Sequence, residues 1–262
     1  MRYFSELAYQ GTNYSGWQKQ LNAPSIQATI EDAFSTILNT PVEVVGCGRT
    51  DAGVHASQYF LHFDFEGNLL PGLVKRVNRF LPPDIAINRI FEVEPAANAR
   101  FDATRRSYEY HLVLHKNPFE INTAWHFPFF KKLDLEKVNA AAKQLLSYNE
   151  FAPFCKTHTD VKTMICEVSH SEWVLDEKAG RMVYHISANR FLRGMVRLIV
   201  GMCLNAGLGK VSLAEVRQAM DAQTPLPNSW SVPPNGLFLS EVKYEKLFHK
   251  KKKPGGHKVN RA

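Results

Sequence analysis

The sequence predicts a mixed α/β (α+β) protein built around a largely antiparallel sheet. Two observations support this fold class. The 262 residues are 45% hydrophobic, which is enough to bury a substantial core. Segments with the two-residue alternation of strands also take turns along the chain with segments of helical periodicity. The length suggests one large domain or two small ones.

The first 95 residues predict six elements in a recognisable order. They are a strand at 2–9, a helix opened by Pro24-Ser25 and running to 38, a short strand at 42–45, a strand around 59–65, a helix over 73–81 stopped by Pro82-Pro83, and a strand at 85–93. This β-α-β-β-α-β order is the ferredoxin-like or split βαβ pattern, in which two helices back an antiparallel sheet.

The second part of the chain repeats this alternation. The predicted elements are a strand from 107 to 114, a helix over 135–146, strands near 163–174 and 183–188, helices at 191–204 and 213–220, and a last strand at 237–242. We therefore expect two related α/β halves, 1–104 and 105–245, although no sequence repeat is visible.

The net charge of +7 comes from the end of the chain. Residues 246–262 hold seven of the 32 basic residues and no acidic ones, so the rest carries 25 basic and 25 acidic residues. A Lys-rich tail with Pro and Gly is expected to be disordered, and it would attract any polyanion without reading its sequence. A solvated terminus with no partner is an equally simple interpretation.

Composition argues against several classes of protein. The four cysteines are scattered without C-x-x-C spacing, the N-terminus is too polar for a signal peptide, and no apolar run approaches the ~18 residues of a membrane span. We expect a soluble, cytoplasmic protein. The chain has no phosphate-binding glycine loop, and the pair His111 and His115 lies on a predicted strand without other metal-ligand motifs. No metal or small-molecule cofactor is indicated.

One carboxylate has unusual neighbours. Asp51 lies in the stretch VGCGRTDAGVHA, on a predicted loop between two strands. Asp is common in loops because its side chain can bond its own backbone, so turn formation is the simplest interpretation. Gly46, Gly48 and Gly53, however, permit a close backbone approach or a positive φ, and Arg49 offers a guanidinium that could pair with a carboxylate or a phosphate. A carboxylate beside arginine stays ionised and suits a nucleophile or an electrostatic stabiliser better than a general acid.

Two further features are ambiguous. Arg190, Arg193 and Arg197 follow a spacing that would place them on one side of the predicted helix 191–204. They form either a solvated basic stripe or a phosphate-reading surface with one arginine turned toward a buried carboxylate. Tyr108 is either a core strand aromatic or a residue at the mouth of a site that stacks on a base.

Together these residues resemble the tRNA pseudouridine synthase A family. Five stretches match in order: Tyr9–Gln18 (YQGTNYSGWQ), Gly48–Ala56 (GRTDAGVHA), Arg100–Tyr110 (RFDATRRSYEY), Asn189–Gly201 (NRFLRGMVRLIVG) and Pro233–Leu239 (PPNGLFL). The resemblance covers residues 3–245, and Gln10 departs from the commoner Tyr-Asp-Gly. The tail is variable in the family.

The resemblance implies a cofactor-free isomerase with the pseudouridine synthase fold. Such an enzyme converts uridine to pseudouridine at positions 38, 39 and 40, in the anticodon stem-loop of tRNA. By likeness, Asp51 is the catalytic aspartate, Arg197 pairs with it, and Tyr108 packs on the target base. Leu237 matches a hydrophobic pocket residue, and Arg49 matches one that helps to hold the flipped-out nucleotide. The family also implies a homodimer whose subunits jointly bind tRNA.

Three alternatives remain open. A paired α/β RNA-binding protein or tRNA chaperone would have no need of Asp51. An aspartate-dependent nucleoside hydrolase would release free uracil, which an isomerase does not. A paralogue within the family would modify a different RNA.

Overall fold

A computed structural model describes residues 1–156 and 163–245. The expectation of a disordered tail at 246–262 lies outside the described residues. The elements are β1 (Arg2–Tyr9), α1 (Ile26–Leu38), β2 (Val45–Gly46), β3 (His55–Asp64), α2 (Leu73–Phe80), β4 (Ile85–Val93), β5 (Ala103–Val113), β6 (Trp125–His126), α3 (Leu135–Gln144), β7 (Val168–Asp176), β8 (Arg181–Ala188), α4 (Met195–Gly207), α5 (Leu213–Ala222) and β9 (Leu237–Tyr244). Short 3₁₀ helices cover Phe130–Lys132, Leu145–Ser147, Ala152–Phe154 and Pro234–Gly236.

The described strands form one sheet in which two halves have the same strand order. The sheet runs β4-β1-β3-β9-β5-β8-β7, with β2 paired to β3 and β6 paired to β5. The first half thus has the order β4-β1-β3-β2, and the second half has the order β9-β5-β8-β7 when the two-residue strand β6 is left aside. Counted along the chain, each half places its strands in the order fourth, first, third, second. All pairings are antiparallel except β3 with β9 and β5 with β6. The predicted fold class is confirmed.

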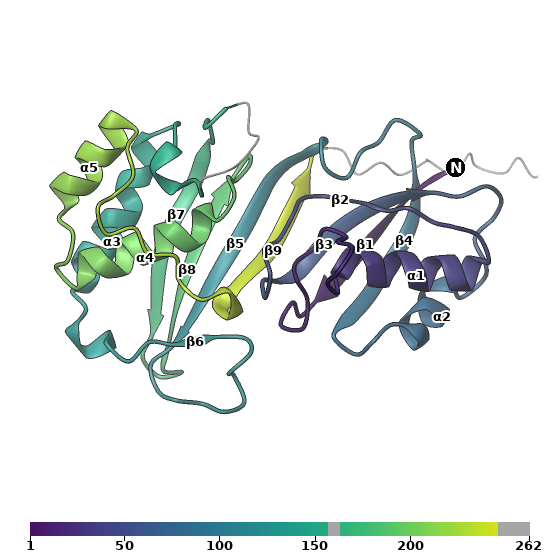
Figure 1. The fold of residues 1–262 in the computed structure, drawn as a ribbon, viewed down its shortest axis with the longest axis horizontal. Helices are drawn as coiled ribbons and strands as arrows, with labels where there is room; N and C mark the ends of the chain where they lie inside the picture. The colour runs from purple at the N-terminus through teal and green to yellow at the C-terminus, as the bar shows by residue number, and fades with distance from the viewer. Residues whose placement is uncertain (157–162, 246–262) are drawn as a thin grey trace, which may run out of the picture.

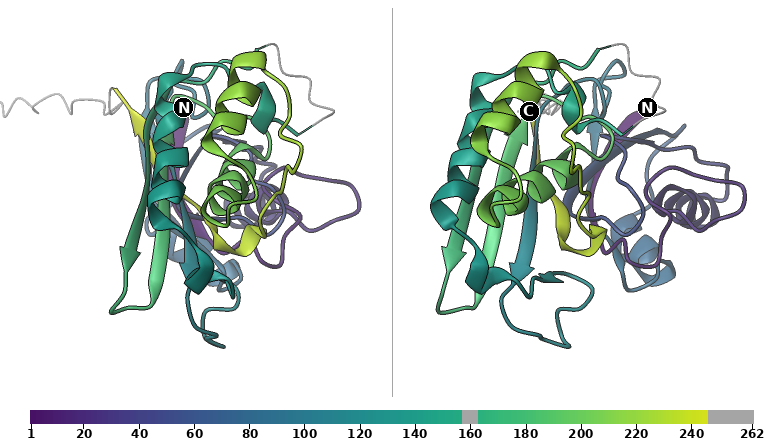
Figure 2. Two further views of the ribbon diagram at one scale, coloured as in Figure 1. Left: turned by 90° about the vertical axis from the view of Figure 1, so that its left-hand side faces the viewer. Right: turned by 60° about the vertical axis from the view of Figure 1, so that its left-hand side comes forward.

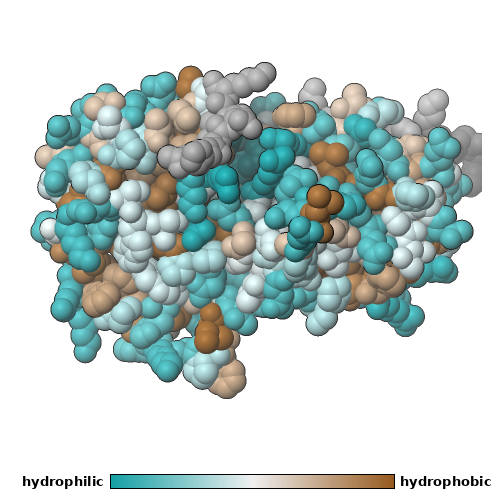
Figure 3. All heavy atoms as spheres, in the orientation of Figure 1, coloured by the Kyte–Doolittle hydropathy of each residue, from teal (hydrophilic) through white to brown (hydrophobic). Residues whose placement is uncertain are grey.

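The helices of both halves lie on one face of this sheet. Figure 1 shows α1 in front of the strands of the first half and α4 in front of those of the second. Figure 2 shows the sheet from the side, with α3, α4 and α5 stacked on that face and the opposite face bare. The view in Figure 3 is mainly hydrophilic, with separate hydrophobic residues rather than a continuous band.

Strand β9 joins the two halves. One edge of β3 pairs with β2 at Val45 and Gly46, and nearer its start with β9 at Phe238 and Leu239. The loop between β2 and β3 therefore lies where the pairing of β3 changes from β2 to β9. Buried side chains form two clusters, each drawn mainly from one half. Strand β9 contributes Leu237 to the second and Leu239 to the first.

Two local expectations from the sequence are wrong. Strand β2 covers residues 45–46 rather than 42–45, because the N–H groups of Val42 and Val44 donate to side chains of helix α1, Ser35 Oγ (2.9 Å) and Glu31 Oε1 (3.2 Å). Those two amides are therefore satisfied without a neighbouring strand.

Helix α4 begins at Met195 rather than at 191. Gly194 precedes it in a left-handed conformation (φ 72°) that the helix cannot include. Arg190 and Arg193 therefore lie in the chain before the helix, and the predicted helical stripe of three arginines does not exist. Only Arg197 lies on α4, in its first turn.

Within the described residues, no helix has both the length and the apolar character needed to span a membrane. Cys47, Cys166 and Cys203 are free thiols.

Candidate active site

The loop that carries Asp51 is held by its own backbone and by residues beneath it. Thr50 is buried, its Oγ1 shares a 2.9 Å hydrogen bond with the Tyr9 hydroxyl, and its carbonyl accepts from the N–H of Trp17 (3.1 Å). Tyr9 in turn packs against Trp17 and Tyr59, deep in the first core. The side chain of Asp51, 31% exposed, is thus presented to solvent from a fixed backbone.

Close backbone approach explains two glycines near this loop. A Cβ on Gly16 would lie 2.5 Å from the carbonyl oxygen of Thr50. Gly53 adopts φ +75°, and a Cβ there would lie 2.8 Å from Cγ of Pro234. The Asp51 loop is therefore packed closely between the segment after β1 and the segment before β9.

Arg197 faces Asp51 from the other half of the molecule. Its Nη1 lies 3.7 Å from Oδ2 of Asp51, an ion-pair distance beyond that of a good hydrogen bond. Its Nε donates to the carbonyl of Val232 at 2.7 Å, and the N–H of Val232 donates back to the Arg197 carbonyl. The Arg197 side chain is only 14% exposed. Its bond to Val232 orients the guanidinium, which directs one nitrogen toward the carboxylate.

Tyr108 lies on β5, where the two cores meet. Its ring packs edge-to-face on Phe191, with centroids 5.1 Å apart, and it contacts both hydrophobic clusters. Burial raises the pKa of its phenol well above the ordinary value. The nearby Cys47 thiol raises this pKa further, the Arg106 guanidinium lowers it, and the Asp51 carboxylate makes the smallest contribution, which raises it. The phenol is therefore neutral near pH 7 and can donate a hydrogen bond.

Sequence comparisons show which protein family the chain is similar to. A family model described as tRNA pseudouridine synthase matches residues 141–245. The tRNA pseudouridine synthase A of Bacteroides thetaiotaomicron is 46% identical over 96% of this chain and 94% of its own length. That of Bacteroides fragilis is 45% identical over 93% and 96%, and that of Porphyromonas gingivalis 44% identical over 93% and 97%.

The chain belongs to the tRNA pseudouridine synthase A family. It is accordingly an enzyme of the isomerase class. Among solved structures, the CRISPR endoribonuclease Cse3 bound to RNA aligns over 79% of this chain and 98% of its own, with 12% identity and a TM-score of 0.20, too low to support an argument.

Two other residues proposed from the family resemblance differ in environment. Arg49 is exposed beside Thr50 and makes no hydrogen bond or ion pair with another described residue, so its guanidinium is available to a ligand. Leu237 is 5% exposed at the start of β9, opposite Tyr110, and belongs to the second core. Its role as a pocket residue of the tRNA pseudouridine synthase A family stays a prediction.

The sequence did not single out His55, which bridges three segments. The N–H of Gly11 donates to its Nδ1 (2.9 Å), and its Nε2 bonds the carbonyl of Asn235 (3.1 Å). With both ring nitrogens used this way, the neutral tautomer with hydrogen on Nε2 satisfies every partner. His55 lies in one of the matched stretches, but its partners come from two others, which only the folded chain brings together.

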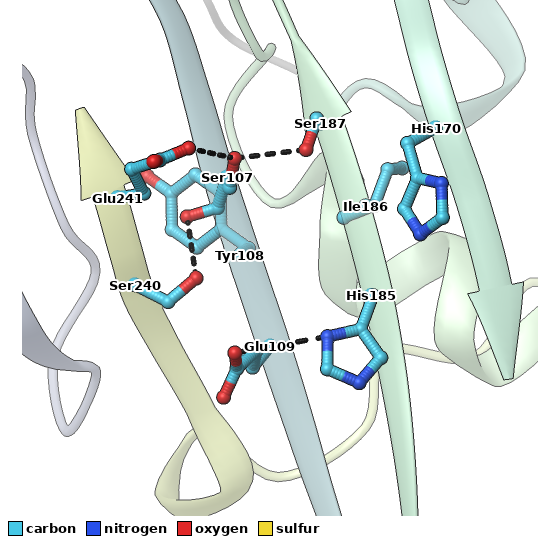
Figure 4. Close-up of a pocket in the computed structure, with 9 residues that line it drawn as sticks. All are labelled: Ser107, Tyr108, Glu109, His170, His185, Ile186, Ser187, Ser240 and Glu241. Atoms are coloured by element: carbon cyan, nitrogen blue, oxygen red, sulfur yellow. Dashed lines mark hydrogen bonds and ion pairs between the residues drawn. The ribbon is translucent and has the colours of Figure 1, made fainter. Parts of the chain in front are cut away.

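A hollow on the bare face of the sheet is distinct from this site. Figure 4 shows it lined by polar side chains of β5, β7, β8 and β9, with Ser107 bonded to Ser187 (2.8 Å) and Glu109 paired with His185 (3.7 Å). Asp51 and Arg197 do not line it. Tyr108 is among the lining residues, but residue alternation along β5 directs its ring to the other face. No group of side chains suited to a metal ion occurs among the described residues.

Proposed function

We propose that this chain isomerises uridine to pseudouridine at positions 38, 39 and 40, in the anticodon stem-loop of tRNA, with Asp51 as the catalytic nucleophile. The observation that carries the proposal is the convergence of the three chemical groups. The Asp51 carboxylate lies 3.7 Å from Arg197, and Tyr108 packs against both hydrophobic clusters, where the two halves meet. They come from three separate stretches of the sequence.

The chemistry needs no net oxidation or reduction. The bond from N1 of the base to C1′ of the ribose breaks, a bond from C5 to C1′ forms, C5 loses its proton and N1 gains one. An ionised carboxylate can attack the base or the sugar, or stabilise positive charge that develops at C1′. All three routes use Asp51 as a carboxylate anion, and Arg197 places a positive charge 3.7 Å from that carboxylate.

The substrate base must leave its stack before it can react. Extruding a stacked uridine costs a few kcal/mol, which contacts to phosphates and to the base must offset. The exposed guanidinium of Arg49, two residues from Asp51, is placed to contact the displaced nucleotide or its phosphate. The edge of the neutral Tyr108 ring offers a surface for the base, and Leu237 is the proposed apolar contact.

The experiment compares the wild-type protein with Asp51→Asn on unmodified tRNA transcripts. Pseudouridine is mapped by reverse-transcription stops after carbodiimide treatment. We expect stops at 38–40 with the wild type, and a loss of at least about 10³-fold in rate with Asp51→Asn, as for removal of a catalytic nucleophile. Binding of tRNA should persist, because the side chain of Asp51 contributes little to the core.

Each alternative has its own outcome. Free uracil would indicate a hydrolase, binding without modification would indicate a binding module, and stops at other positions or in other RNAs would indicate a paralogue. Full activity of Asp51→Asn would overturn the assignment of the nucleophile.

We also propose that the protein is a cytoplasmic homodimer that binds tRNA with both subunits. Light scattering of the purified chain should give twice the mass of 29.8 kDa. A monomer that is fully active would remove the second subunit from the proposal.

A further inference from the structure

Arg106 makes an unusual set of contacts for an arginine. It lies on β5 and is half-buried, and its guanidinium donates only to backbone carbonyls. Nε and one Nη2 hydrogen go to Cys47 (3.2 and 2.8 Å), the Nη1 hydrogens go to Ala103 (3.1 Å) and Asn189 (2.9 Å), and the other Nη2 hydrogen goes to Arg100 (2.7 Å). All five N–H donors of the side chain are used.

The acceptors belong to the three segments that present the proposed catalytic groups. Cys47 opens the loop of Asp51, and Arg100 and Ala103 lead into the strand of Tyr108. Asn189 follows β8 and begins the segment that leads to Arg197 on α4. The Arg106 side chain is therefore hydrogen-bonded to the three backbone segments that carry or lead to Asp51, Tyr108 and Arg197.

The arrangement matches a guanidinium and no other side chain. Its donors form a rigid planar fork, whereas the ammonium of lysine is a single point with three donors. Arg106 also lies two residues from Tyr108 on the same strand, so both side chains are on the helical face of the sheet. The neighbouring Arg105 is on the other face and pairs with Glu241 at 3.4 Å.

We propose that Arg106 is a positioning residue that sets the loop of Asp51 relative to Tyr108 and to the segment before Arg197. This proposal rests on the proposed function, and it deepens that function by assigning a residue that does not itself react. Misplacing catalytic groups by about 1 Å can cost about 10²-fold in rate. A loss of the fork should therefore reduce turnover more than it reduces binding of tRNA.

The test compares Arg106→Lys with Arg105→Lys, a matched control one residue away. We expect Arg106→Lys to lower kcat about 10- to 100-fold while the Kd for tRNA changes less than about threefold. Arg105→Lys should leave both within about twofold, since a surface ion pair contributes little. In Arg106→Ala, added guanidinium chloride, well below unfolding concentrations, should restore part of kcat, whereas methylammonium chloride should not.

Hydrogen exchange gives a readout that does not depend on activity. Arg106→Lys should speed amide exchange in peptides covering 47–54 and 189–194, and leave helix α5 unchanged. This result would support the positioning role even if the wild type proved to modify a different RNA.

Three results would overturn the proposal. They are a kcat for Arg106→Lys within about twofold of the wild type, a parallel loss of kcat and tRNA affinity, or failure of both Arg106 variants to fold at low temperature. The last would show that Arg106 holds the fold rather than the site. A wild-type protein that forms no pseudouridine at 38–40 would instead count against the proposed function, and exchange at 47–54 would still decide the role of Arg106.

Discussion

Arg197 makes two separate contacts, and a substitution by lysine can distinguish their contributions. Nε is fixed to the carbonyl of Val232 at 2.7 Å, while Nη1 faces Asp51 at 3.7 Å. The first contact orients the side chain, and the second places positive charge beside the carboxylate. A lysine ammonium can reach one of these positions but not both.

We expect Arg197→Lys to lower kcat about 10- to 100-fold, because the lost hydrogen bond from a charged group contributes roughly 1.5–3 kcal/mol. The Kd for tRNA should change little, since the side chain is mostly buried. Single-turnover kinetics and filter binding measure the two quantities. Arg217→Lys on the exposed face of α5 is the control. Near-normal turnover of Arg197→Lys would mean that the reaction does not need both contacts from this side chain.

His55 predicts a dependence of stability on pH. Burial lowers its pKa below 6.5, an effect that the hydrogen bond to Asn235 opposes and that His111 reinforces. The folded state therefore favours the neutral ring. Its contribution to stability is complete above pH 6.5, the value in the unfolded chain, and is lost as pH falls through the lower folded value.

His55→Gln keeps a donor and an acceptor but cannot titrate in this range. Its free energy of unfolding in urea should fall less between about pH 7.5 and about pH 5 than that of the wild type. His62 and His185 have lowered pKa values for the same first reason, burial, and they remain in both proteins. An identical pH dependence in variant and wild type would show that His55 is not a source of the effect.

Among the elements, the Asp51 loop and the 3₁₀ turn Pro234–Gly236 are fitted against each other at Gly53. Gly53→Ala introduces both a left-handed alanine and a Cβ 2.8 Å from Pro234. Gly209→Ala is a matched control, because Gly209 has φ +71° and a Cβ there would meet nothing within 4 Å. We expect losses of about 1 kcal/mol for Gly209→Ala and about 2–3 kcal/mol for Gly53→Ala.

The turnover rates of Gly53→Ala and Gly209→Ala should differ more clearly than their stabilities. Gly53→Ala should also lower kcat, because relieving the contact with Pro234 requires the Asp51 loop and the turn Pro234–Gly236 to move apart. Gly209→Ala should keep wild-type kcat. Equal losses of stability and equal kcat in the two variants would show that the contact with Pro234 is relaxed at no cost.

The elements show where sequence patterns suffice. Strands β1 and β4 and helix α1 follow from periodicity, and α1 begins where Ser25 accepts from the N–H of Ala28. The extent of β2 could not be predicted, because its amides are satisfied by side chains of α1 rather than by a strand. The first turn of α4 depends on the conformation of Gly194, which the pattern of apolar residues does not report.

The site was predictable only in part for the same reason. A motif identifies Asp51, but its 3.7 Å separation from Arg197 depends on the docking of the two halves, which is a long-range property. Arg106 and His55 lie within matched stretches too. Their roles come from carbonyl groups of distant segments, and those groups have no signature in the sequence.

At the scale of the whole molecule, the last strand completes the first core. Leu239 is 1% exposed and belongs to the cluster of the first half, although it lies far along the chain from β3. Met182 on β8 is also 1% exposed and belongs only to the other cluster. This pair of residues can test whether the proposed halves 1–104 and 105–245 are energetic units.

We expect Leu239→Ala and Met182→Ala each to lower the free energy of unfolding by about 2–5 kcal/mol, because each leaves a cavity in a closed core. Native-state hydrogen exchange should then distinguish them. Leu239→Ala should weaken protection mainly in β1, β3 and α1, and Met182→Ala mainly in β5, β8 and α3. If either variant weakens protection equally in both halves, the two cores unfold together. In that case β9, which contributes to both, couples the halves into a single cooperative unit, and the boundary at 104 describes topology only.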